Sequence, residues 1–203
     1  MKYLKLNLNS PEQEVLLEIA SYLKKGKVVV MPTDTIYGLS CLATSQKAIQ
    51  KIALIKKKPL DKDHPFLVLV SSLVQAKKVA TISERKNKIW KNFRETGRPV
   101  TVIFPSRCVL AKDLENKQGG LGLRLPVSNF LRKLIKLSNE TPLVSTSFNL
   151  HQQEPFADMT QAIRFFENQE FRPDLIVDGG PPLSSRSSQL LDLCGEKEII
   201  LRK

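Results

Sequence analysis

Short runs of β-branched residues alternate along this chain with segments of helical periodicity, and this alternation limits the possible folds more than any other feature. The run "KVVVMP" (27–32) is closed by proline and is typical of a buried strand. The segment "SQKAIQKIALIKKK" (45–58) carries apolar residues at helical spacing. Between them, "TDTIYGLS" (33–40) is expected to be a loop. Interleaved strands and helices predict an α/β fold with a largely buried, mixed sheet.

The same two patterns recur to the end of the chain. The helix at 45–58 is expected to start at a cap on Thr44 or Ser45 and to end at Pro59. A second helix, 82–97, has Ser83 as its cap and Gly97 as its stop. Further strands are expected at 65–72, 98–106, 120–126, 141–147, 174–180, 188–193 and 198–203, and further helices at 128–139 and 158–168.

The chain is strongly basic, with a formal net charge of +12 at pH 7. A polyanionic partner is therefore indicated, either a nucleic acid or a nucleotide triphosphate. The charge is uneven, because residues 77–98 hold eight basic and two acidic side chains. A functional basic surface and mere solubility both remain open for this segment.

The chain has no apolar run near the roughly 20 residues of a membrane span, and its N-terminus lacks the apolar core of a signal peptide. Its three cysteines are far apart, which argues against a disulfide framework or a zinc site. We therefore expect a cytoplasmic protein without membrane contact.

Several catalytic motifs are absent. There is no Walker A loop, and "GGLGLR" (119–124) has neither the spacing nor the following helix of a dinucleotide fingerprint. Only His64 and His151 are present, without an HExxH motif. A catalytic zinc site and a Ser-His-Asp triad are thus disfavoured.

Three polar clusters remain, each next to an expected strand or helix end: "PTDTIYG" (32–38), the lysine run 56–58 and "STSFN" (145–149). Arg124 alternates with leucines in "LGLRLP", so its side chain points away from them, into solvent or a pocket. Hydroxyls, an amide and cations without a nucleophile–base pair can orient a substrate and stabilise charge on phosphates. Phosphoryl or nucleotidyl transfer requires little more.

Each cluster also has a purely structural explanation. "PTDT" can be a turn whose Thr and Asp side chains cap backbone groups. "STS" can be a strand end, and the lysines can sit at a helix C-terminus, where the dipole favours cations.

As an ordered set, however, these pieces resemble the YrdC-like family, the threonylcarbamoyl-adenylate synthases of tRNA modification. The matching segments run from about Lys24 to Arg202: "KKGKVVVMPTDTIYGLSC", "IALIKKKPLDKDHPFLVLV", "RPVTVIFP", "LGLRLP", "PLVSTSFN", "DLIVDGG" and "EIILRK". The resemblance implies one YrdC-like domain over residues 1–203. It also implies a twisted, open mixed sheet with flanking helices and a large basic cavity.

The resemblance further implies an activity. Such a nucleotidyltransferase makes threonylcarbamoyl-AMP and pyrophosphate from L-threonine, bicarbonate and ATP. ATP would arrive with Mg²⁺, and no tightly bound, protein-ligated metal is expected. A downstream tRNA threonylcarbamoyl transferase complex would receive the product, and the protein itself could contact tRNA or double-stranded RNA.

The family motifs assign roles residue by residue. The family's Lys-x-Arg pair falls on Lys56 and Lys58, which the resemblance makes catalytic and ATP-binding. Its Ser-x-Asn motif, a nucleotide contact, falls on Ser147 and Asn149. Two departures stand out, since position 58 is lysine rather than arginine and Phe148 replaces the usual small alanine.

The resemblance places threonine binding at Thr35 and Tyr37. Arg124 falls on the strand arginine between the threonine and nucleotide sites, so it is expected to serve both. Ser145 lies one strand repeat before Ser147, can face the same side and is expected to bind threonine. Further candidates in the "DGG…SS" segment are Asp178, Ser187 and Ser188.

An alternative is a YrdC-like paralogue that binds RNA or a nucleotide without efficient synthesis. Two observations suggest this alternative: the basic segment 77–98 and the missing arginine at position 58. Trp90 and Phe93 interrupt that segment at helical spacing and are expected in the core, which leaves few aromatics to stack on bases.

Overall fold

The computed structural model describes residues 1–151, 153, 156, 158–182, 184 and 187–203. Within these residues the chain forms ten strands and six α-helices. The strands are β1 (Lys2–Lys5), β2 (Val29–Met31), β3 (Gly38–Leu42), β4 (Leu67–Leu69), β5 (Val100–Pro105), β6 (Gly120–Arg124), β7 (Leu143–Ser147), β8 (Leu175–Asp178), β9 (Gln189–Asp192) and β10 (Ile199–Arg202). The helices are α1 (Gln13–Lys24), α2 (Gln46–Ile55), α3 (Leu73–Val79), α4 (Glu84–Glu95), α5 (Asn129–Leu137) and α6 (Met159–Glu167), with a 3-10 helix, η1 (Lys112–Leu114).

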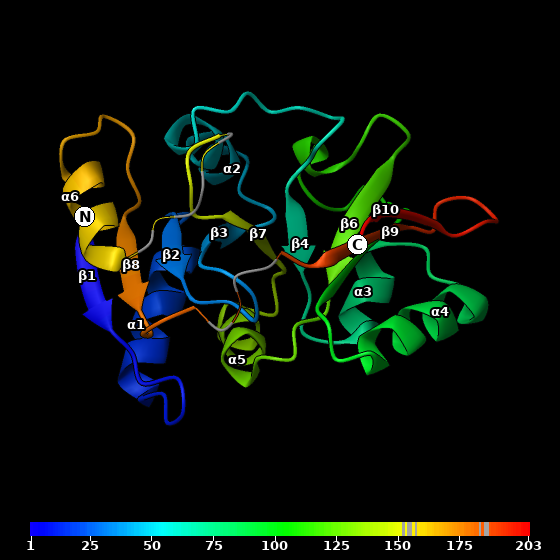
Figure 1. The fold of residues 1–203 in the computed structure, drawn as a ribbon, viewed down its shortest axis with the longest axis horizontal. Coiled ribbons are helices and arrows are strands. Elements are labelled where there is room, and N and C mark those ends of the chain that lie inside the picture. Colours follow the sequence, from blue (N-terminus) through cyan, green and yellow to red (C-terminus); the bar gives the residue numbers. More distant parts are fainter. Residues whose placement is uncertain (152, 154–155, 157, 183, 185–186) are drawn as a thin grey trace.

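All ten strands join one twisted, open sheet in the order β1-β8-β2-β3-β7-β4-β6-β5-β9-β10. Figure 1 shows its strands from β1 to β6 from left to right. Strands β1 and β2 pair parallel with β8, as do β4 with β6 and β5 with β9. The remaining pairs are antiparallel. The predicted α/β class and the mixed sheet are therefore confirmed.

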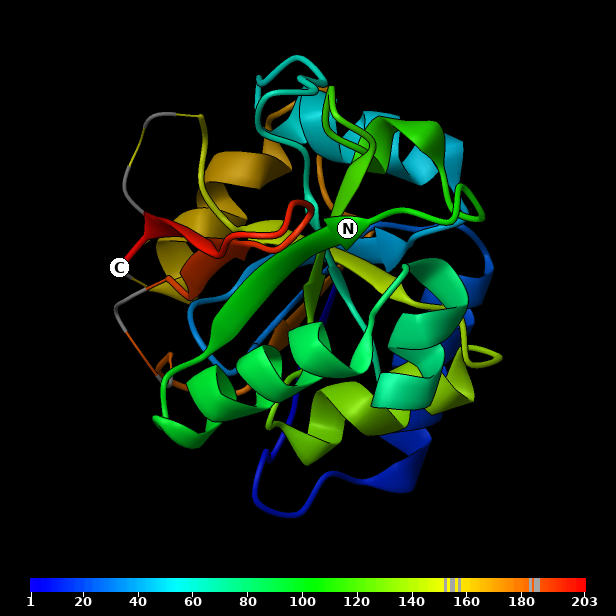
Figure 2. The same ribbon diagram turned by 90° about the vertical axis from the view of Figure 1, so that its right-hand side faces the viewer.

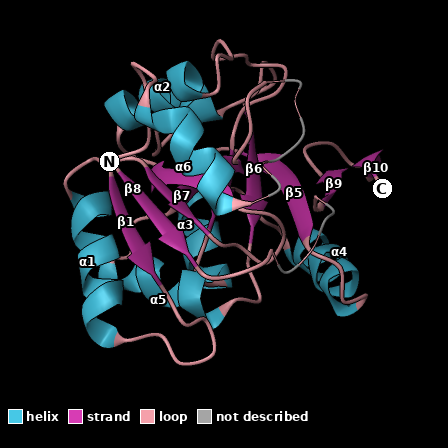
Figure 3. Cartoon of the chain, turned by 60° about the vertical axis from the view of Figure 1, so that its left-hand side comes forward, coloured by secondary structure: helices cyan, strands magenta, loops and turns pink. Residues whose placement is uncertain are grey.

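The helices cover the two faces of the sheet unequally (Figure 3). Helices α2, α3, α4 and α6 contribute buried side chains such as Ile52, Trp90 and Phe166 to a large core on one face. Helices α1 and α5 pack Leu16 and Leu134 into a smaller core on the other. Figure 2 shows α4 in green alongside β5, which β9 and β10 separate from the edge of the sheet.

Strand alternation determines what lies on the face that α1 and α5 leave uncovered. Val102 of β5, Leu123 of β6 and Val144 of β7 point into the larger core. Their neighbours in sequence point to the opposite face, because successive side chains of a strand alternate. On β5, β6 and β7 these neighbours include Thr101, Arg124 and Ser145, so this part of the sheet is lined with polar groups.

Most elements agree with the sequence prediction, and Ser45 and Ser83 cap α2 and α4 as expected. Strand β1, helix α1 and helix α3 were not predicted. Helix α1 has no side-chain cap at Glu12, so it lacks the usual start signal. Strand β1 is exposed and depends on its pairing with β8, far away in sequence.

Several boundaries differ from the prediction, and two of these lie beside the polar part of the sheet. The loop expected at 33–40 ends early, because Gly38 begins β3, which is held between β2 and β7. Helix α2 ends at Ile55 instead of at Pro59, since Lys57 adopts a left-handed φ of 50°. The amides of Lys57 and Lys58 bond back to Leu54 and Ala53, which is a Schellman turn.

Candidate active site

A cavity of about 680 Å³ lies over the polar part of the sheet. Alternate residues of the central strands form its floor: Gly38, Thr101, Ile103, Gly120, Gly122, Arg124, Ser145 and Ser147. Its volume is in the range that small-molecule sites occupy, roughly 300–1,000 Å³. The cavity therefore arises from strand alternation, with glycines leaving room where side chains would fill it.

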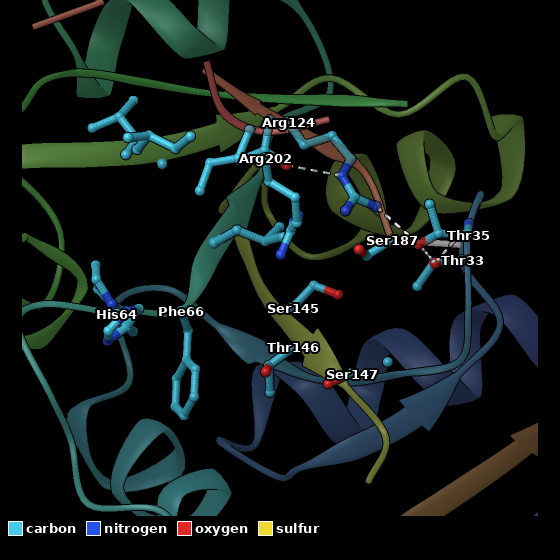
Figure 4. A pocket seen from close by; sticks show the side chains of 18 of the residues that line it. Thr33, Thr35, His64, Phe66, Arg124, Ser145, Thr146, Ser147, Ser187 and Arg202 are labelled. Carbon is cyan, nitrogen blue, oxygen red and sulfur yellow. Dashed lines mark hydrogen bonds between the residues drawn. The ribbon is translucent and has the colours of Figure 1, made fainter. Parts of the chain in front are cut away.

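The walls of the cavity differ in chemistry (Figure 4). Hydroxyl groups line one side, including Thr35 and Ser145, and Arg124 and Arg202 lie across from Ser145. Phe66 and His64 line a third side, next to Lys58. The described lining thus combines hydroxyls, cations and an apolar surface, which suits a ligand with anionic and flat apolar parts.

Arg124 is held inside the sheet by four hydrogen bonds. Its Nη1 donates to Asp34 at 3.1 Å and to Thr35 at 3.2 Å, its Nη2 donates to Ser188 at 2.9 Å, and its Nε donates to Thr101 at 3.3 Å. The Arg124 and Asp34 side chains are only 6% and 3% exposed. Burial lowers the pKa of Arg124, and the Asp34 carboxylate opposes this effect. Asp34 therefore neutralises Arg124, for which strand alternation had left solvent and a pocket open.

The "PTDTIYG" segment is both a turn and a cavity wall. The hydroxyl of Thr33 donates to the carbonyl of Ile36 at 2.6 Å and accepts from the amide of Thr35 at 3.0 Å. These bonds are the backbone caps expected if the segment is only a turn, yet Thr33 and Thr35 also line the cavity. The two explanations thus hold together.

Tyr37 reaches across to the loop after β8. Its hydroxyl donates to the carbonyl of Gly180 at 2.7 Å and accepts from the amide of Gly179 at 2.8 Å. Burial is the main reason that the pKa of Tyr37 rises to about 12. The phenol is therefore neutral at physiological pH and fastens this loop, while the residue itself contributes to the cavity lining.

Lys56 and Lys58 occupy different environments. Lys58 is half-buried, lines the cavity, donates to the carbonyl of His64 at 2.8 Å and lies 5.6 Å from the ring centroid of Phe66. Lys56 is 4% exposed, and its ammonium contacts Ser147 and Asn149. The exposed Lys57 between them provides the left-handed turn that separates their directions.

The environment of Lys56 predicts a pH-dependent stability. Burial, and secondarily the charge of Lys58, lower the pKa of Lys56 from 10.5 to about 8. The unfolded chain binds more protons between these two values, so the free energy of unfolding should rise with pH in this window. Relative to Lys56→Met, the wild type should gain on the order of 3 kcal/mol.

Urea unfolding of both proteins below pH 8 and near pH 10.5 measures this gain. Comparison with the variant cancels other titrating groups that both proteins share. A stability difference that stays constant across the window would contradict the buried placement of a charged Lys56.

The structure gathers most predicted site residues around one cavity. Those that line it are Thr35, Tyr37, Lys58, Arg124, Ser145, Ser147 and Ser187. Lys56 and Asn149 are not among the described lining residues and connect to it through Ser147. Ser188 is buried behind the cavity beside Arg124. Asp178 is not among the described lining residues, but its carboxylate accepts hydrogen bonds from Tyr3 and, at 3.4 Å, from the cavity-lining Tyr37.

Sequence reasoning did not assign several lining residues. Thr101 carries a signal that could have been found, because it is the polar residue of an otherwise apolar strand, and Gly122 alternates with Leu121 and Leu123 on the same side as Arg124. Arg202 is the polar residue of β10, the final strand of the sheet. Asp34 was noted within its cluster, but nothing local indicates that its partner is Arg124, 90 residues away.

Phe148 lies away from the cavity. It is 2% exposed and packs against Phe156 and Phe166, with ring centroids 5.2 and 5.3 Å away. The residue therefore belongs to the larger core, together with Ala162 of α6. The substitution relative to the family pattern thus fills the core under α6, and Phe148 is not among the described lining residues.

Gly122 offers a direct test of the cavity. A Cβ atom built there would lie 3.7 Å from Thr101 and 4.0 Å from Leu67, which are ordinary contacts. Gly122→Val should therefore fold normally while its side chain fills part of the cavity floor, and ligand binding should weaken about tenfold or more. Thermal unfolding and titration with ATP, the ligand that the sequence resemblance implies, measure the two effects, with the exposed Gly195→Ala as control. Unchanged binding would exclude this floor as the ligand site.

Comparison with known proteins finds a matching family model and related sequences. A family model named Sua5/YciO/YrdC and described as "Telomere recombination" matches residues 21–203. A threonylcarbamoyl-AMP synthase of Pyrococcus abyssi is 27% identical over 199 residues, which cover 97% of this chain and 56% of the archaeal protein. The chain thus spans little more than half of that relative.

Solved structures resemble this fold closely. P. abyssi Sua5 complexed with L-threonine aligns with a TM-score of 0.86 and 24% identity, covering 100% of this chain and 57% of the other. Escherichia coli YciO aligns with a TM-score of 0.83 and 23% identity, covering 100% and 94%. In the part of the chain that the structure describes, every helix is too short or too polar to cross a bilayer.

Proposed function

Because this chain belongs to the Sua5/YciO/YrdC family, we propose that it is an L-threonylcarbamoyladenylate synthase. It would make threonylcarbamoyl-AMP and pyrophosphate from L-threonine, bicarbonate and ATP. The observation that carries the proposal is the cavity, which hydroxyl groups, two arginines and Lys58 line together. Such a site can bind an amino acid and a triphosphate together.

The threonine end of the cavity is proposed to be the side lined by Thr35 and Ser145, with Arg124 between them and the nucleotide. All three side-chain nitrogens of Arg124 donate hydrogen bonds within the protein, and Asp34 balances its charge. Arg124 is therefore better suited to positioning a substrate than to attracting an anion strongly. Tyr37 would form the wall there. A threonine-bound structure of P. abyssi Sua5, which shares this fold, supports an amino acid as one ligand.

The triphosphate end is proposed to lie between Lys58 and Arg202. Both cations line the cavity, and neither is paired with a carboxylate within 4.0 Å among the described residues. Ser147 and Asn149 would position the nucleotide, and the apolar wall at Phe66 offers a surface for the base. ATP is expected to enter as its magnesium complex, as a substrate.

The chemistry then needs few groups from the protein. The threonine amine and bicarbonate form a carbamate with loss of water. A carbamate oxygen attacks the α-phosphorus of ATP, a new P–O bond forms, and the bond to the departing pyrophosphate breaks. Lys58 and Arg202 would stabilise the charge that develops on pyrophosphate. The product would pass to a transferase complex that modifies tRNA.

The alternative of RNA binding without synthesis has weaker support. Trp90 is buried against Phe104 with ring centroids 5.3 Å apart, and Phe93 packs against the core, as expected from the sequence. The basic helix α4 therefore offers no exposed aromatic for stacking on bases. Binding of tRNA by this helix would rest on charge alone and decline steeply with salt.

The proposed activity has a direct assay. Purified protein incubated with ATP, L-threonine and bicarbonate should yield threonylcarbamoyl-AMP by mass spectrometry, with threonine-dependent release of pyrophosphate. Replacing threonine by alanine should reduce both signals. Folded protein that forms neither product would refute the synthase, and salt-sensitive tRNA binding by that same sample would favour the alternative.

A further inference from the structure

The ammonium group of Lys56 has no free proton. Its Nζ donates to the carbonyl of Ser147 at 2.7 Å, the carbonyl of Asn149 at 2.9 Å and the Oδ1 of Asn149 at 2.6 Å. A protonated lysine carries three N–H bonds, so these three acceptors use all of them. The Oγ of Ser147 adds a longer contact at 3.4 Å.

The acceptor side is equally well defined. Asn149 Oδ1 also accepts from the hydroxyl of Ser147 at 2.5 Å, while its Nδ2 donates to the carbonyl of Gln153. The backbone is tied in as well, because the carbonyl of Lys56 accepts from the amide of His151 at 2.9 Å. The end of α2 is thereby fastened to the turn after β7, and the Asn149 amide has one orientation.

Lys58 contrasts with Lys56 although only one residue separates them. It lines the cavity and, in the described structure, donates one hydrogen bond, to His64. Two of its N–H bonds are therefore available to a ligand. Lys56 is nearly inaccessible to solvent, whereas Lys58 faces the space where a phosphate would lie.

From this geometry we infer that Lys56 is a positioning residue, which fixes Ser147 and Asn149 and leaves phosphate contact to Lys58. The inference relies on the proposed function only for the identity of the ligand. It changes the role that the sequence motif suggests for the first lysine, since this ammonium would act through Asn149 without touching phosphate.

A double-mutant cycle tests the inference, with ATP as the probe and calorimetry as the measurement, in the absence of threonine and bicarbonate. Lys56→Met and Asn149→Ala should each weaken ATP binding about tenfold or more, because each removes the same oriented group. The double variant should be no more than about twofold weaker than either single variant. Fully multiplicative effects would mean that Lys56 contacts the ligand itself and would overturn the inference.

Two lysine variants serve as references in the same titrations. The effect of Lys58→Met should multiply with that of Lys56→Met, because the two residues are proposed to act separately. Lys57→Met removes an exposed ammonium and should bind ATP like the wild type. If Lys56→Met does not fold, Lys56→Gln, which keeps two N–H donors, enters the cycle with the same expectations.

A second readout needs no ligand. The side-chain amide of Asn149 can be followed by ¹⁵N NMR and assigned by its loss in Asn149→Ala. Its resonances should move in Lys56→Met, or in Lys56→Gln, and stay in place in Lys57→Met. Unchanged resonances in the Lys56 variant would overturn the positioning role. If folded wild-type protein binds no ATP, the synthase proposal fails while this measurement still decides the role of Lys56.

Discussion

Asp34→Asn should lower the free energy of unfolding by about 3–5 kcal/mol, because it leaves the Arg124 guanidinium without its counter-charge in the protein interior. The two side chains are 3.1 Å apart and at most 6% exposed. An asparagine retains the shape and one oxygen acceptor, but it cannot compensate a buried positive charge. Urea or thermal unfolding of the purified variant measures the loss.

Two comparisons make this result specific. Asp63→Asn removes the partner of Lys117 from an ion pair of 2.7 Å whose side chains are more than half exposed, and it should cost less than about 1 kcal/mol. Adding Arg124→Met to Asp34→Asn removes the unpaired charge and should recover part of the lost stability. If both aspartate variants lost equally little stability, the contribution of the Asp34–Arg124 pair to stability would not depend on its burial.

Lys58→Met should reduce kcat/KM for ATP in threonylcarbamoyl-AMP synthesis by about 100-fold or more, as expected when a cation is removed from a developing phosphate charge. Lys58 lines the cavity, and its pKa is lowered mainly by burial. Lys58→Arg keeps the charge and adds the planar fork that the family motif contains. It should therefore match or exceed the wild type.

The control for these variants is Lys57→Met, whose side chain is exposed and should leave synthesis unchanged. Steady-state release of pyrophosphate with varied ATP measures all three. A Lys58→Met enzyme with wild-type kcat/KM would remove Lys58 from the phosphate site. A large loss in Lys58→Arg would show that the cavity accommodates only the compact ammonium.

Local signals account for the elements that the sequence predicted well. Ser45 and Ser83 accept amide hydrogen bonds at the starts of α2 and α4, and "KVVVMP" supplies the apolar run of β2. Strand β3 was assigned to a loop because its pairing with β2 and β7 comes from distant segments. Propensity within a short window cannot anticipate such pairing.

The site residues also fall into those that a local pattern indicates and those whose contacts depend on the tertiary structure. The alternation around Arg124 correctly indicated a side chain that points away from the leucines of β6. Its pairing with Asp34 and the engagement of Lys56 by Asn149 depend on where β6, β7 and α2 meet in space. Motif spacing placed Lys56 and Lys58 together, yet one left-handed residue gives them different environments.

The cavity joins a floor of hydrogen-bonded strands to a rim of loops. Floor positions such as Gly122 and Ser145 belong to the sheet, whereas Lys58, His64 and Asn116 lie on connecting segments. Rim loops accept insertions and deletions, whereas an insertion in a floor strand would shift its register against the neighbouring strands. After duplication of such a gene, the two proteins would therefore acquire different ligands through changes in the rim first. Their floor residues would stay similar for longer.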